Sequence, residues 1–311
     1  MKASNPSAYR PGTPLGGHPR SIATRPQSVA VRPPVLLSDL AAFARELNLS
    51  ALDFSLLAAF VLCRPRSFVL AHPEQKLSLR QQKSLCRLIK RRAKHEPMAY
   101  LLGQREFYGR NFIIKPGVLV PRPETETIID AVRQILANNL PRKNTKLDLI
   151  DLGTGSGVIA ITLALEFPTL LKLTATDISA SALACTQLNL KKFQLSSISL
   201  IKSKFFAARA LRKKRFDIIV ANLPYLDPTW SWLSPELSFE PKQALFAKAH
   251  GQKDIKTLLK LTPKHLKPAG FLVLEFDPCE QAELSQYAQK HGFKLICQNS
   301  AWVSVWQVAS A

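Results

Sequence analysis

The sequence predicts a doubly wound α/β fold, in which helices cover both faces of a mostly parallel sheet, with a small helical region ahead of it. Two observations predict this fold. Apolar runs of strand length alternate with apolar helical stretches beyond residue 125, and a glycine-rich loop follows the first run. The strands are expected at residues 147–152, 171–176, 198–201 and 216–221, with helices beginning at Val158 and Ser179.

Three segments precede this sheet. Residues 1–34 are rich in proline, glycine, serine and arginine and contain no acidic residue, which predicts a disordered basic extension. A transit peptide is disfavoured because prolines oppose its amphipathic helix, which leaves a tail or a misassigned start. Residues 35–100 show helical apolar spacing and predict a helical domain. The aromatic stretch 107–114 predicts a β-hairpin within a linker, residues 101–124, and the sheet domain takes residues 125–311.

Composition indicates a globular protein with a basic surface. Hydrophobic residues make up 46% and charged residues 21%, and 43 Lys and Arg against 22 Asp and Glu give a formal net charge of +21. Such a charge favours polyanions, including RNA or the ribosome, although a merely solvated basic surface explains it equally well. Lys83, Arg87 and Arg91 fall four apart on one predicted helix face, where they could bind an acidic partner or simply face water.

Cysteine usage and hydropathy predict a cytoplasmic protein. The five cysteines are odd in number and widely separated, and no Cys-x-x-Cys pair predicts a zinc site or a redox disulfide. No run of about 18 uncharged apolar residues predicts a membrane span, and the start lacks an apolar signal core. We therefore expect no metal and no membrane partner. The cysteines are Cys63, Cys86, Cys185, Cys279 and Cys297.

The first predicted strand runs into the loop Gly153-Thr154-Gly155-Ser156-Gly157. Glycines there allow a sharp turn beneath a nucleotide-type cofactor and a close approach of the backbone to it. The third glycine comes one position too early for a dinucleotide fingerprint, which favours S-adenosylmethionine. Asp177 ends the second strand about 20 residues on, where a ribose hydroxyl needs an acceptor. Taken separately, each feature could be ordinary turn chemistry.

The strand at 216–221 ends in Asn222-Leu223-Pro224-Tyr225, at the sheet edge where open α/β sheets bind ligands. A planar nitrogen substrate would suit such a site. The Asn222 side-chain oxygen and a backbone carbonyl can accept its two N–H bonds, and Tyr225 offers a face for packing. By itself the motif could be a proline-containing strand terminator.

These residues carry a resemblance. Asn222-Leu223-Pro224-Tyr225 resembles the Asn-Pro-Pro-Tyr motif of methyltransferases that act on adenine or on glutamine amides. The stretches 106–109 and 120–126 are similar to the interdomain region of the release factor glutamine methyltransferases, and the second is highly specific. The resemblance extends from about Ser38 to the C-terminus.

The resemblance implies a class I, Rossmann-like methyltransferase sheet with an antiparallel last strand, and a helical domain that recognises the substrate. It implies N5-methylation of the glutamine in the Gly-Gly-Gln motif of peptide chain release factors, with S-adenosyl-L-methionine as cofactor. A monomer is taken by default, since the sequence does not determine the oligomeric state. The implied cofactor-binding residues are Gly153, Thr154, Gly155, Ser156, Gly157, Asp177, Phe205 and Asn222, and the implied catalytic residues are Asn222, Leu223, Pro224 and Tyr225. We expect direct in-line transfer without a general base, and Glu124 and Glu126 are expected to be structural or cofactor-side.

The sequence departs from the family pattern at three places. Leu223 stands where the family usually has proline, although any residue supplies the needed carbonyl and Pro224 keeps Leu223 extended. Lys204 stands where an acidic residue usually lies near the adenine, which predicts a changed contact there. Residues 248–254 lack the paired glycines usual before the next helix.

Two other functions fit parts of the pattern. An adenine-N6 methyltransferase acting on RNA or DNA shares the motif and suits the positive charge, but no separate base-reading domain is visible. A catalytically silent binding module would keep the fold while losing activity through the changes at Leu223 and Lys204.

Overall fold

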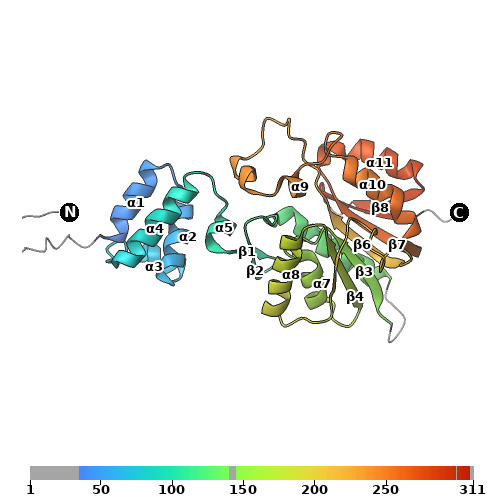
Figure 1. Cartoon of the computed structure of the whole chain (residues 1–311), viewed down its shortest axis with the longest axis horizontal. Helices are drawn as coiled ribbons and strands as arrows, with labels where there is room; N and C mark the ends of the chain where they lie inside the picture. Colours follow the sequence, from blue (N-terminus) through green and yellow to red (C-terminus); the bar gives the residue numbers. More distant parts are fainter. Residues whose placement is uncertain (1–34, 140–144, 299, 309–311) are drawn as a thin grey trace, which may run out of the picture. The chain divides into compact units, whose positions relative to one another are not determined.

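The computed structural model describes residues 35–139, 145–298 and 300–308. The basic extension predicted at 1–34 lies outside the described residues. Along the described chain, a helical region comes first, a β-hairpin follows, and a seven-stranded sheet with its helices completes the fold (Figure 1). Within these ranges, no helix has the length and apolarity needed to cross a membrane.

The helical region is built from amphipathic helices around one apolar cluster. Leu57, Leu85 and Ile89 are fully buried in that cluster. Side chains fix the helix starts, because Ser50 accepts a hydrogen bond from the backbone of Asp53 at 3.0 Å and so satisfies one free N–H group. The helices are α1 (Leu37–Glu46), α2 (Ala51–Leu62), α3 (Arg66–Ala71), α4 (Leu79–Arg92) and α5 (Met98–Leu102).

The hairpin pairs β1 (Gln104–Phe107) with β2 (Arg110–Ile113) and begins three residues before the predicted stretch. Its two-residue turn, Tyr108-Gly109, has positive φ at both positions, which matches the right-handed twist of the flanking strands. Phe107 and Phe112 are buried in edge-to-face contact, with ring centroids 6.1 Å apart. Both rings belong to the core of the sheet domain, so the hairpin is packed against that domain.

The sheet has the order β5-β4-β3-β6-β7-β9-β8. Strands β3 to β7 pair in parallel, whereas β9 is antiparallel to both its neighbours, β7 and β8. The expected antiparallel last strand is confirmed, and it lies inside the sheet. The strands are β3 (Leu147–Leu152), β4 (Leu171–Asp177), β5 (Ser199–Lys202), β6 (Phe216–Asn222), β7 (Leu266–Glu275), β8 (Phe293–Gln298) and β9 (Val303–Val308).

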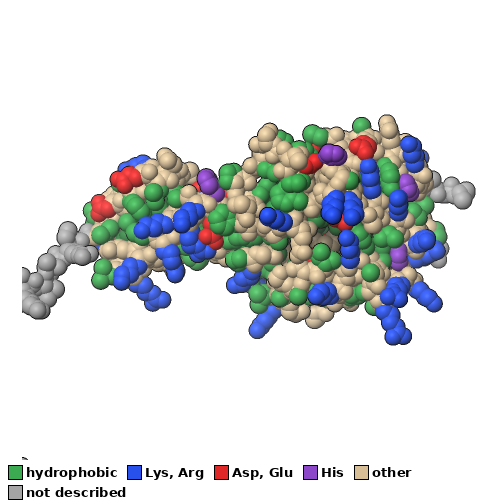
Figure 2. Space-filling model, turned by 45° about the horizontal axis from the view of Figure 1, so that its top comes forward, with side chains coloured by type: hydrophobic (Ala, Val, Ile, Leu, Met, Phe, Trp, Pro, Cys, Tyr) green, Lys and Arg blue, Asp and Glu red, His purple; other side chains and the backbone are tan. Residues whose placement is uncertain are grey.

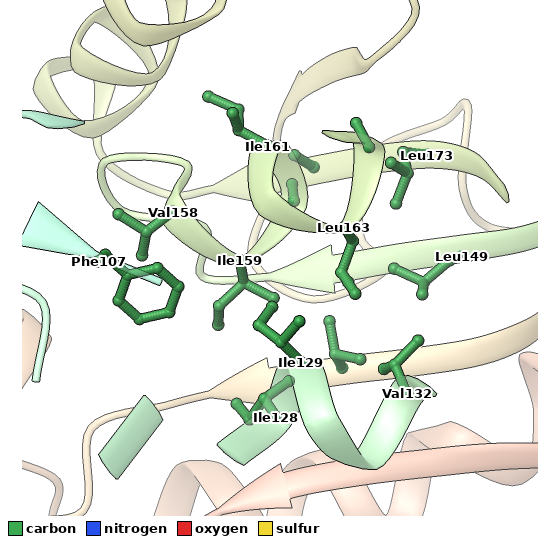
Figure 3. Close-up of a cluster of buried hydrophobic side chains, with 14 of the residues drawn as sticks. Phe107, Ile128, Ile129, Val132, Leu149, Val158, Ile159, Ile161, Leu163 and Leu173 are labelled. Atoms are coloured by element: carbon green, nitrogen blue, oxygen red, sulfur yellow. The ribbon is translucent and has the colours of Figure 1, made fainter. Parts of the chain in front are cut away.

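Helices cover both faces of this sheet, which confirms the doubly wound prediction. Successive residues of β3 face opposite cores, so Leu149 packs with α6 and α7 while Ile150 packs with α10 and α11. Figure 3 shows Phe107, Ile129, Ile159 and Leu149 among the side chains that fill the first core. The helices are α6 (Glu126–Asn138), α7 (Val158–Glu166), α8 (Ala180–Lys192), α9 (Lys242–Leu245), α10 (Lys253–Leu261) and α11 (Gln281–Lys290), with short 3-10 turns at Pro123–Thr125, Pro235–Phe239, Thr262–Lys264 and Pro278–Glu280.

The chain order of the strands reverses at β3, because β4 lies on one side of it and β6 on the other. Ligands of open α/β sheets bind in the crevice outside the carboxyl ends of the strands at such a switch point. The loops that follow β3, β4, β5 and β6 therefore define where a functional site is expected.

Candidate active site

A cavity of about 820 Å³ opens at this switch point. The ends of β3, β4, β5 and β6, or the loops that follow them, each contribute to its lining. The lining includes Gly153 and Gly155 after β3, Asp177 at the end of β4, Phe205 after β5, and Asn222, Leu223 and Pro224 after β6. The structure thus brings together seven of the residues that the sequence predicted.

The glycine loop has a different reason for each glycine. Gly155 has φ +59°, and a side chain there would point into open space, so its backbone borders the cavity. Gly153 has φ +77°, a backbone conformation that residues with a side chain rarely adopt. Gly157 has φ +85°, and a Cβ there would come within 2.7 Å of Thr186, which makes glycine necessary for packing against α8.

Thr154, Ser156 and Gly157 are absent from the lining of the cavity. Thr154 and Ser156 are buried beneath the loop, and the Thr154 hydroxyl donates to Oδ2 of Asp151 at 2.6 Å. Burial raises the pKa of Asp151 to about 7. The sequence analysis did not single out Asp151, although a carboxylate between two apolar residues directly before the glycine loop is the signal that could have identified it.

Asp177 presents acceptor oxygens beside the open space at Gly155. Its two carboxylate oxygens accept hydrogen bonds from the backbone of Gly155 at 3.0 Å and of Ser179 at 2.8 Å. Burial raises the pKa of this carboxyl. Each oxygen keeps a second lone pair, so the carboxylate can still accept from two hydroxyl groups. The residues present therefore fit the ribose diol of an adenosyl cofactor.

Asn222 is a polar group of the cavity whose side-chain orientation is fixed by its neighbours. Its Nδ2 donates to the Thr125 hydroxyl at 3.0 Å, and β6 pairs with β7 so that Asn222 lies opposite Glu275. The amide NH₂ faces Thr125 and the Glu275 carboxyl, which fixes which way the amide is turned. No described residue donates a hydrogen bond to Oδ1 of Asn222, so this acceptor is available to a ligand.

Glu275 supports this arrangement from a fully buried position at the end of β7. The Tyr225 hydroxyl donates to its Oε1 at 3.1 Å. Burial raises the pKa of Glu275 to about 7. Burial and the neighbouring Glu275 also raise the pKa of Tyr225, so the phenol stays protonated as a donor. Sequence analysis missed Thr125 and Glu275; the signal was a single acidic residue closing an apolar run at 271–275.

A second cavity, the outer groove, adjoins the first and shares Asn222 and Leu223 with it. Tyr225, Trp232 and Trp302 line it together with Arg122 and Glu124. Trp232 is 62% exposed although it is a large aromatic residue, and its ring stacks on Trp230 with centroids 4.8 Å apart. The outer groove thus offers an apolar surface directly beside the Asn222 amide.

Two acidic residues of the 120–126 stretch have separate places. Glu126 accepts a hydrogen bond from the backbone of Tyr108 at 2.8 Å and so holds the hairpin turn. Glu124 lines the outer groove.

In the stretch that lacks paired glycines, residues 248–254, Gly251 has φ +88°, and a Cβ there would lie 2.1 Å from the Tyr225 carbonyl oxygen. The loop therefore packs closely on the backbone of Tyr225.

Residues 114–232 match the methyltransferase small domain family, and residues 36–103 match the PrmC N-terminal domain. A release factor glutamine methyltransferase of Coxiella burnetii is 36% identical over 245 residues, which cover 79% of this chain and 85% of the relative. The chain belongs to the release factor glutamine methyltransferase family. It is an S-adenosylmethionine-dependent methyltransferase, and the resemblance stated from the sequence is confirmed.

For two other similar proteins, the match covers a smaller share of one of the two chains. A bifunctional methyltransferase of Rickettsia bellii is 33% identical over 274 residues, and this member of the release factor glutamine methyltransferase family spans 48% of its length. Among solved structures, a methyltransferase from Pyrococcus furiosus aligns with a TM-score of 0.47 and 17% identity, covering 66% of this chain and 91% of that one.

Proposed function

We propose that this chain transfers a methyl group to the side-chain amide N5 of the glutamine in the Gly-Gly-Gln motif of peptide chain release factors, in the cytosol where they act. The observation that carries the proposal is the orientation of Asn222, whose NH₂ is fixed by Thr125 and whose Oδ1 faces no donor in the described chain. An amide nitrogen presents two N–H groups, which need two acceptors. The names of the relatives support the choice of protein substrate.

These residues catalyse the reaction by positioning the glutamine amide. S-Adenosylmethionine, when bound, supplies an electrophilic methyl group. Oδ1 of Asn222 and the carbonyl oxygen of Leu223 accept hydrogen bonds from the two N–H groups of the glutamine amide. They thereby direct its nitrogen toward the first cavity, which we call the donor cavity. Leucine supplies this carbonyl as well as proline does. After attack the extra proton leaves to water, so no general base is assigned.

The cofactor site follows from the lining of the first cavity. Asp177 accepts from the ribose, Gly153 and Gly155 let the cofactor approach the backbone, and Phe205 packs on the base. Thr154, Ser156 and Gly157 give the loop its shape from behind. Asn222 belongs to both subsites, because it lines the donor cavity and the outer groove.

The protein substrate is expected to lie along the outer groove and the helical domain, residues 35–100. Trp232 and Trp302 offer an apolar surface to the chain that flanks the glutamine. On α4, Lys83 and Arg87 are exposed, whereas Arg91 pairs with Glu96. Figure 2 shows that Lys and Arg side chains predominate over acidic ones on the face in view. The positive charge favours binding to an acidic surface of the release factor, and it is compatible with RNA nearby on the ribosome.

Mass spectrometry of a release factor incubated with the enzyme and S-adenosylmethionine tests the proposal. The expected result is one added methyl group on the glutamine of the Gly-Gly-Gln peptide. Two controls are included: the same release factor with asparagine in place of that glutamine should stay unmethylated, and the wild-type factor incubated with Asn222→Ala enzyme should be methylated about 10²- to 10³-fold more slowly. An unmodified factor together with intact cofactor binding and methylated adenine in added RNA would reject the proposal in favour of the nucleic-acid substrate.

A further inference from the structure

The end of the donor cavity beyond Asp177 carries an ion pair that the proposed function does not use. Lys204 follows β5, and Asp254 is the second residue of α10. Both line the donor cavity with Phe205, and Nζ of Lys204 lies 3.4 Å from Oδ1 of Asp254. The side chains are 62% and 24% exposed, and exposed ion pairs contribute little to stability. Both residues also line the cavity, where they can contact a ligand.

The order of the strands places the adenine at this end. Asp177 ends β4, whereas Asn222 ends β6 on the far side of β3. In the cofactor the ribose stands between the sulfur and the base. With the ribose at Asp177 and the methyl group toward Asn222, the base must extend to the β5 side. The loop after β5 holds Phe205 and Lys204 there, and α10 packs in the same core as Phe205.

Few side-chain acceptors are available at this end of the donor cavity. The Ser203 hydroxyl is committed, because it donates to the carbonyl of Phe205 at 2.9 Å and accepts from the backbone of Ala208 at 3.0 Å. Lys204 carries donors alone. Among the described residues, Asp254 has one polar partner, Lys204, through one carboxylate oxygen. Its other oxygen is an acceptor without a committed donor.

Together the two side chains match one edge of adenine. The Watson–Crick edge presents the N1 acceptor next to the N6 amino donor. An ammonium donor beside a carboxylate acceptor is complementary to that pattern. Hypoxanthine, the deaminated base, reverses it, because its N1 carries a hydrogen and its O6 is an acceptor. We propose that Lys204 and Asp254 together read the Watson–Crick edge of the cofactor's adenine, so that an acid on α10 replaces the one absent after β5. The proposal rests on the cofactor placement proposed above.

Calorimetric titration of two ligands tests this reading without any methyl transfer. S-Adenosylhomocysteine and S-inosylhomocysteine differ at the base edge alone. The wild-type chain is expected to bind the adenine ligand about 10- to 100-fold more tightly, the value of a hydrogen bond to a charged group. In Asp254→Ala the adenine ligand weakens by a similar factor while the inosine ligand does not, so the ratio falls to near one. Lys204→Ala is expected to reduce the same ratio.

The matched control is Lys256→Ala, which removes a cation from the same helix that pairs with Glu283 and does not line the donor cavity. It should keep the wild-type ratio, and melting temperatures confirm that each variant is folded. An unchanged ratio in Asp254→Ala overturns the proposal. Equal weakening of both ligands also overturns it, because Asp254 would then act through the structure of the loop. The assay contains no release factor, so neither outcome bears on the N5 reaction.

Discussion

Replacing Glu275 with glutamine is expected to reduce the loss of stability that the protein suffers between pH 5 and pH 8. Glu275 is fully buried at the end of β7, between Tyr225 and Asn222. Burial raises the pKa of its carboxyl from 4.5 to about 7. Glutamine has the same shape and keeps an oxygen for the Tyr225 hydroxyl, but it does not ionise.

The direction of this pH dependence follows because the buried carboxyl of the folded state favours the protonated form over the ionised form. Below pH 4.5 the carboxyl is protonated in both the folded and the unfolded chain, and the folded state pays no ionisation cost. As the pH rises through 4.5 toward 7, the unfolded chain releases its proton first, so stability falls until the folded carboxyl also ionises. At about 1.4 kcal/mol for each pH unit, the interval from 4.5 to about 7 corresponds to about 3.5 kcal/mol, of which about 3 kcal/mol is lost above pH 5.

Chemical unfolding at pH 5 and pH 8 measures this difference for the wild type and Glu275→Gln. Asp151 and Glu280 also have pKa values raised to about 7, and both remain in the variant, so their contributions cancel in the comparison. Glu46→Gln, at an exposed position, is the control and should behave as the wild type. If the free energy of unfolding changes equally with pH in Glu275→Gln and the wild type, Glu275 is not a buried acid of this kind.

Three further substitutions test the site. Asn222→Ala should lower the single-turnover rate by about 10²- to 10³-fold while cofactor affinity by calorimetry stays close to wild type, because a positioned acceptor is lost; unchanged turnover would remove Asn222 from the site. Asp177→Ala should weaken cofactor binding by about tenfold or more, and an unaltered dissociation constant would exclude it as the ribose ligand. Gly251→Ala should destabilise the fold by about 1 to 3 kcal/mol, since its Cβ would meet the Tyr225 carbonyl; an unchanged melting temperature contradicts this packing.

The first half of the sheet could be predicted from local pattern because its strands are apolar and bounded by turns. The predicted range 147–152 coincides with β3, and the predicted 216–221 ends one residue before β6 does. The extra residue, Asn222, is in the strand because it pairs with Glu275 of β7. The sequence analysis assigned no separate range to β7, β8 and β9. The exposure of β8 alternates along the strand, and β9 is placed by its pairing with β7. Local sequence does not reveal such a pairing.

The same distinction divides the site. Gly153, Gly155, Asp177 and Asn222 lie within motifs whose strand-loop context is local, and the structure gathers them around one cavity. Thr125 is 97 residues from the Asn222 amide that it anchors. Glu275 and Asp254 likewise come from segments that only the assembled sheet brings to the cavity. Local motifs therefore predict the groups that line the cavity, whereas the groups that orient them depend on long-range packing.

This long-range support explains why leucine can stand in the Asn222-Leu223-Pro224-Tyr225 turn. The Asn222 amide is oriented by Thr125 and Glu275, neither of which contacts position 223 through a polar group. Tyr225 is held separately by its hydrogen bond to Glu275 and by Gly251 against its carbonyl. The orientation of Asn222 and Tyr225 therefore does not depend on the side chain at position 223. It is buried, packs beside Gly153 and lines both cavities, so leucine forms an apolar wall where the donor cavity meets the outer groove.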